Sequence, residues 1–89
     1  MPRLTLPQVL QRHLSCPPLD VAGGSVRAVL EAAFVVYPTL RGYLVEDDGS
    51  LRRHVAVFVD GRPVRDRRSL SDRVPATARV DVLQALSGG

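Results

Sequence analysis

The chain has 89 residues, which is enough for one domain with a single hydrophobic core. Hydrophobic residues make up 45% of the sequence and charged residues 24%, and this composition excludes an intrinsically disordered chain. The net charge is +3, but acidic residues are interspersed with the arginines and aromatic residues are few, so no nucleic-acid-binding surface is expected.

No apolar stretch approaches the length that crosses a bilayer, and residues 1–7 lack the apolar block of a secretory signal. We therefore expect a cytoplasmic protein that does not bind membranes. The one cysteine, Cys16, excludes an internal disulfide and is expected to be a small, buried or half-buried hydrophobic residue. Every basic residue is an arginine, so the chain offers no lysine amine for isopeptide bonds.

The N-terminal part of the sequence predicts two short strands around a helical turn. Residues 3–6 alternate polar and apolar side chains, as a strand does, and the apolar spacing in residues 8–15 suits an irregular helical turn. Residues 19–21 alternate again, and we expect them to pair with the first strand.

The clearest periodic pattern predicts an amphipathic helix over residues 26–37. Its apolar side chains recur at intervals of three and four residues, at Val26, Val29, Leu30, Ala33, Phe34 and Tyr37. Arg27 and Glu31, four residues apart, share the outer face of this helix. Ser25 can cap its first turn through the side-chain hydroxyl, and Pro38 ends it.

A long connection follows over residues 39–53, and Leu40, Tyr43 and Leu44 are expected to anchor it. Residues 54–59 are partly apolar on both faces, which predicts a central strand. Asp60-Gly61 then indicates a two-residue hairpin, because both turn positions need a positive φ.

The return strand begins at Arg62, and Pro63 marks it as irregular or at an edge. Residues 62–73 mix arginines with aspartates, a pattern typical of a solvated loop. The last strand covers roughly residues 79–85. One main helix packed on a mixed sheet of four or five strands places the chain in the α+β class.

The sequence lacks the motifs of an independent enzyme. His13 and Cys16 are too few to make a zinc site, so no metal is expected. Gly23-Gly24 has neither the lysine nor the spacing of a phosphate-binding loop, and His54 has no second ligand or nucleophile near it in the sequence.

The chain ends in Leu86-Ser87-Gly88-Gly89, directly after the last predicted strand. Neither final glycine has a Cβ, so such an end can enter a narrow slot. A terminal carboxylate has a pKa of about 3.5, and in its ionised form it is a poor electrophile. Joining it to AMP supplies a leaving group, and a sulfur nucleophile can then form an acyl–sulfur bond.

This order of elements resembles the MoaD/ThiS family of ubiquitin-like sulfur carriers over essentially the whole chain. The resemblance is carried by the helix that begins at residues 25–30, by residues 54–61 with their Asp-Gly hairpin, and by the terminal Leu-Ser-Gly-Gly. It implies a β-grasp fold, with a domain over residues 1–85 and a flexible tail over residues 86–89.

The resemblance also implies a chemistry in which Gly89 is the reacting residue. An adenylyltransferase of the ubiquitin-activating type would adenylate the Gly89 carboxylate with ATP, and a persulfide donor would convert it to a thiocarboxylate. A synthase would then accept the sulfur. Gly88 would let the tail thread the activating site, with Ser87 as a flexible lead. The carrier itself would bind no cofactor.

We expect the partner enzyme to contact the sheet face near the tail, with Leu83, Ala85 and Leu86 as candidates. Core packing of Leu83 is an equal alternative, given its place in the strand. Two other functions stay open: a ubiquitin-like protein modifier, and a plain interaction module in which the glycines are incidental. The chain length and the segment between Pro38 and His54 favour a MoaD-like carrier, as in molybdopterin synthesis, over a ThiS-like one.

Overall fold

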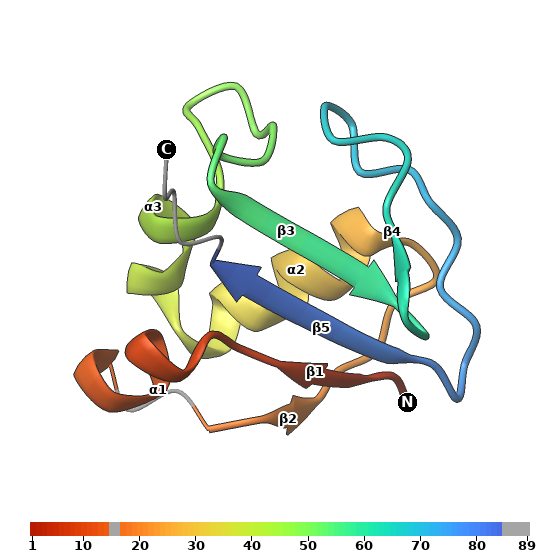
Figure 1. The fold of residues 1–89 in the computed structure, drawn as a ribbon. Helices are drawn as coiled ribbons and strands as arrows, with labels where there is room; N and C mark the ends of the chain where they lie inside the picture. The colour runs from red at the N-terminus through yellow and green to blue at the C-terminus, as the bar shows by residue number, and fades with distance from the viewer. Residues whose placement is uncertain (15–16, 85–89) are drawn as a thin grey trace.

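A computed structural model describes residues 1–14 and 17–84 of the chain (Figure 1). One five-stranded sheet has the strand order β2-β1-β5-β3-β4. The strands are β1 (Arg3–Thr5), β2 (Leu19–Asp20), β3 (Val55–Val59), β4 (Arg62–Pro63) and β5 (Arg79–Gln84). The helical segments are α1 (Gln8–Leu14), α2 (Val26–Val36), the 3-10 turn η1 (Pro38–Leu40) and α3 (Arg41–Leu44).

The last strand, β5, forms the centre of the sheet. It runs parallel to β1 and antiparallel to β3, so Arg3 lies beside Arg79 at one end and Val55 beside Gln84 at the other. The N-terminus therefore lies at the start of β5, and the described chain ends at the opposite end of the sheet (Figure 1). As predicted, β2 pairs with β1, and the pairing is antiparallel.

The main helix, α2, packs across one face of the sheet (Figure 1). The Ser25 hydroxyl accepts a hydrogen bond from the Ala28 N–H at 3.1 Å, which confirms the predicted N-cap. The helix ends at Val36, because Tyr37 leaves the helical region and Pro38 begins η1. The predicted range of residues 26–37 is thus right to within one residue.

The alternating apolar residues of the strands and the apolar face of the helix pack together in one core. The inner sheet face contributes Leu4, Val55, Val57, Val80 and Val82, and α2 contributes its five buried residues. The short helical turns η1 and α3 and the loop between β4 and β5 supply further fully buried side chains, among them Leu40, Leu44 and Leu70. The core therefore depends on the segments between the regular elements as well as on those elements.

The predicted long connection over residues 39–53 is partly wrong, because it begins with two short helical turns. Leu40 and Leu44 lie four residues apart, so a helical backbone turns both side chains toward the core, where each is at most 1% exposed. The same geometry turns Tyr43 outward, and its side chain is 51% exposed. The prediction of Tyr43 as an anchor is therefore wrong.

The hairpin that joins β3 to β4 confirms its prediction. Asp60 has φ of 49° and Gly61 has φ of 82°, the two positive values that this turn requires. The turn brings Arg62 opposite Val59 and Pro63 opposite Phe58. Pro63 lies on β4 at the edge of the sheet, as predicted, and β3 is an interior strand between β4 and β5.

Candidate functional site at the end of the central strand

The structure describes β5 as far as Gln84, which pairs with Val55. The predicted tail and most of the predicted site lie outside the described residues: Ala85, Leu86, Ser87, Gly88 and Gly89. The structure therefore fixes the platform from which these five residues continue. In Figure 1, β5 ends on the same side of the molecule as α3.

Leu83 is the one predicted site residue within the described chain. It lies opposite Ala56 of β3, and because its neighbour Val82 points into the core, Leu83 points to the outer face of the sheet. Its side chain is 50% exposed, so the alternative of core packing is wrong. Its contact with a partner enzyme stays a prediction.

The outer face of the sheet becomes polar farther from this end. Two residues before Leu83, Asp81 accepts a hydrogen bond from the Thr5 hydroxyl and is paired with Arg79, whose Nε lies 3.0 Å from a carboxylate oxygen. Phe58 lies beside Asp81 and is half-buried. Leu83 and Ala56 therefore form a small apolar surface next to the point where residues 85–89 begin.

A second apolar surface lies beside α3. An open hollow of about 590 Å³ is lined by Pro38, Thr39, Arg41, Gly42, Tyr43, Val45, Glu46, Asp47 and Arg52. Its two arginines are already paired, Arg41 with Glu31 and Arg52 with Glu46 at 3.0 Å. Sequence reasoning missed this hollow, because it treated the segment as a connection without helical turns.

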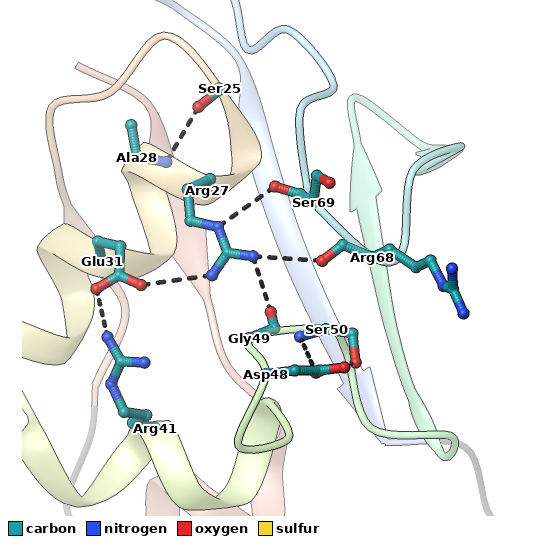
Figure 2. Close-up of polar contacts among 10 residues, drawn as sticks. All are labelled: Ser25, Arg27, Ala28, Glu31, Arg41, Asp48, Gly49, Ser50, Arg68 and Ser69. Carbon is teal, nitrogen blue, oxygen red and sulfur yellow. Dashed lines mark hydrogen bonds and ion pairs between the residues drawn. The ribbon is translucent and has the colours of Figure 1, made fainter.

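Arg27 connects α2 to two loops (Figure 2). Its guanidinium donates to the carbonyl oxygens of Gly49 at 2.9 Å, Ser69 at 3.3 Å and Arg68 at 3.4 Å. It also lies 3.5 Å from the Glu31 carboxylate, which pairs through its other oxygen with Arg41. The four-residue spacing predicted only that Arg27 and Glu31 share a face, whereas the carbonyl acceptors leave no signal in the sequence.

We expect Arg27→Met to lower the free energy of unfolding by about 1–2 kcal/mol, since several partly exposed charge-assisted hydrogen bonds are lost together. Urea denaturation followed by circular dichroism measures the change. The matched control is Arg3→Met, which removes only the exposed pair with Asp20 and is expected to cost less than about 0.5 kcal/mol. Equal losses in the two variants would contradict the connecting role of Arg27.

The arginine-rich segment over residues 62–73 is more ordered than its charge pattern predicted. Its arginines at 62, 65, 68 and 73 are exposed, as expected of a solvated loop. However, both Asp72 oxygens accept backbone N–H groups, from Arg65 and Asp66 at 2.9 Å each. Hydrogen bonds from the Ser71 hydroxyl and the Ser69 N–H lower the pKa of Asp66 to about 2. The two aspartates thus hold the loop backbone in place.

The described part of the chain offers little else with the chemistry of a site. Residues 1–14 and 17–84 contain no group of three or more His, Cys, Asp and Glu side chains placed to hold a metal ion. His54 is exposed in a turn just before β3, and Cys16 lies outside the described residues. Within the same ranges, every helix is too short or too polar to cross a membrane.

Solved structures similar to this one cover nearly the whole chain. A chain in the Amycolatopsis orientalis BexX/CysO complex superposes with a TM-score of 0.86 at 21% identity, covering all of both chains. CysO of Mycobacterium tuberculosis gives 0.83 at 21% identity, over 97% of this chain and 100% of that one. SAMP1 of Haloferax volcanii gives 0.78 at 24% identity, over 99% and 98%.

The fold is a ubiquitin-like β-grasp. The fold class that the resemblance to the MoaD/ThiS family implied is therefore confirmed. No protein-family model matches the sequence, and the search of curated proteins found no significant match. At these identities the likeness concerns the fold alone.

Proposed function

We propose that this protein is a sulfur carrier whose Gly89 carboxylate is activated by adenylation and converted to a thiocarboxylate. The observation that supports it most is the position of Gly88 and Gly89, four and five residues beyond a central β-grasp strand whose end is flanked by exposed apolar surface. The similar structures of CysO, one of them in a complex with BexX, support the same function. The proposal requires that Gly89 carries the free carboxylate.

The reaction proceeds in four steps on partner enzymes. A Gly89 carboxylate oxygen attacks the α-phosphate of ATP, and pyrophosphate leaves. The terminal sulfur of a persulfide then attacks the acyl carbon, and AMP leaves. A thiol reduces the resulting acyl disulfide, which yields the thiocarboxylate and a new disulfide. A synthase finally accepts the sulfur, in molybdopterin synthesis or a related pathway.

In this scheme the domain presents its C-terminal tail, and the surfaces beside it, to the partner enzymes. β5 pairs with β1 through Arg79, Val80 and Asp81 and with β3 as far as Gln84, so the strand is fixed relative to the rest of the domain up to Gln84. Leu83 and Ala56 offer apolar contact beside it, and Gly88 and Gly89 are narrow enough for a closed active site. Leu83, Ala85 and Leu86 are the proposed contacts with the adenylyltransferase, and Ser87 is the proposed lead into the active site.

The test is mass spectrometry of the intact protein and its C-terminal fragment, isolated from its own cells. We expect a sulfur-for-oxygen replacement that fragmentation places on Gly89 and that thiol alkylation traps. Fragment placement is needed because oxidation of Met1 or Cys16 adds a similar mass. An unmodified Gly89 in sulfur-fed cells that contain the activating enzyme would sink the proposal.

A second candidate function is that of a protein modifier, which uses the same acyl adenylate but passes the acyl group to a lysine of another protein. The fold is also similar to SAMP1, a small archaeal modifier protein. Denaturing blots of native extracts separate the two functions, since a modifier produces larger conjugates and a carrier does not. Because this chain has no lysine, its conjugates would not extend into chains through its own side chains.

A further inference from the structure

Neither backbone conformation nor packing within the described chain requires a glycine at position 42. It is the one glycine in a helix of residues 1–14 and 17–84, where glycine is less favourable than alanine. Its φ is not positive, and a Cβ added there would meet nothing within 4 Å. By contrast, Gly61 needs its φ of 82°, and a Cβ on Gly23 would lie 2.7 Å from the Val29 nitrogen. Without a Cβ at Gly42, the backbone of another chain can approach the surface of α3 closely.

Gly42 lines the hollow beside α3, and this hollow is connected to the end of β5 by three hydrogen bonds. Gln84 pairs with Val55, whose N–H donates to the Arg52 carbonyl at 3.0 Å. Arg52 in turn donates from its N–H to the Leu44 carbonyl at 3.0 Å and from Nε to the Gly42 carbonyl at 2.8 Å. The hollow and the end of β5 at Gln84 are therefore joined by hydrogen bonds at the same end of the domain.

The length of the tail limits where an enzyme that holds Gly89 can be. Five residues separate Gln84 from Gly89, and when fully extended they span about 17 Å. The domain measures 33 × 26 × 24 Å, so an enzyme that encloses Gly89 has to lie against the end of the molecule that contains α3. The surfaces at this end are within its contact area.

The charge pairing within the hollow leaves its apolar side chains as the surface available for contact with a partner. Arg41 and Arg52 are paired with Glu31 and Glu46, so their charges are largely compensated within the chain. The lining also includes Tyr43 and Pro38, which are exposed, the buried Val45, and the exposed carboxylate of Asp47. Exposed Tyr43 and Pro38 in an open hollow give a side chain of another protein an apolar surface to pack against.

We infer that the hollow beside α3 receives an apolar loop of the enzyme that activates Gly89, as a second contact in addition to the sheet face at Leu83. The inference rests on the proposed function. Gly42 lets the backbone of that loop approach α3, and Tyr43 and Pro38 pack against its side chain. The enzyme thereby holds the domain from two sides of the tail, which orients the carboxylate for adenylation.

Two threonine variants test the contact. Thr39 lines the hollow, and Thr77 lies in the exposed turn before β5, at the opposite end of the sheet. We expect Thr39→Arg to raise the KM for the carrier at least about tenfold, in ATP–pyrophosphate exchange catalysed by the ubiquitin-activating-type adenylyltransferase of the same organism. Thr77→Arg adds the same side chain and should leave KM unchanged within about twofold.

Gly42→Ala supplies a readout that a purely structural role would not move. It should raise Tm by about 3–6 °C, because alanine favours the helix, and it should nevertheless raise KM. If Thr39→Arg and Gly42→Ala both keep the KM of the parent protein, the inference is overturned while the proposed function stands. If the parent protein itself supports no exchange, the proposed function fails, and the inference with it.

Discussion

A variant with one alanine added after Gly89 is expected to lose activation while its fold stays unchanged. The added residue moves the carboxylate by about 3.5 Å and places a Cβ at the reacting position. Displacement of a reacting group by as little as 1 Å can cost about a hundredfold in rate, so we expect adenylation to fall by at least that factor. ATP–pyrophosphate exchange with the adenylyltransferase measures the rate, and thermal unfolding shows that the fold is retained.

The matched control adds the same alanine before Met1. β1 runs parallel to β5, so the N-terminus lies at the far end of the sheet from Gln84. We therefore expect this extension to leave exchange unchanged. If both extensions are activated equally well, adenylation does not depend on the position of the Gly89 carboxylate, and the proposed role of Gly89 is wrong.

Much of the fold could be predicted from the sequence because its signals are local. The three-and-four spacing of α2, its Ser25 cap and the Asp60-Gly61 turn each depend on neighbouring residues, and each is found as predicted. The exposed position of Leu83 also follows from the alternation of β5, once Val82 is known to face the core. The register of a single strand decides between the two faces, and the sequence alone left that choice open.

The parts that the sequence did not reveal depend on hydrogen bonds to backbone groups, which residue types do not specify. Arg27 binds the carbonyl oxygens of Gly49, Arg68 and Ser69, which any residue at those positions would offer. Asp66 and Asp72 accept backbone N–H groups, so their role cannot be distinguished from that of solvated charges by residue type. The helical turns η1 and α3 could have been predicted, because the four-residue spacing of Leu40 and Leu44 is typical of a helix.

One face of α3 packs in the core and the other lines the hollow, and a pair of alanine variants tests these two roles separately. Leu44 is 1% exposed and packs in the core, whereas its neighbour Tyr43 is 51% exposed and lines the hollow. Leu44→Ala removes buried methyl groups and leaves a cavity, so we expect it to lower the free energy of unfolding by about 2–4 kcal/mol. Tyr43→Ala removes an exposed ring and should change that free energy by less than about 0.5 kcal/mol.

Urea denaturation gives both values, and a small domain of this size has a total of about 5–10 kcal/mol to lose. If Tyr43→Ala were as destabilising as Leu44→Ala, α3 would present the wrong face to the core. The hollow would then not be an outer surface. If Tyr43→Ala keeps its stability and still raises the KM for the carrier in ATP–pyrophosphate exchange, the increase reflects lost contact with the adenylyltransferase. The fold of α3 and the use of its outer face are thereby tested by neighbouring residues in one short helix.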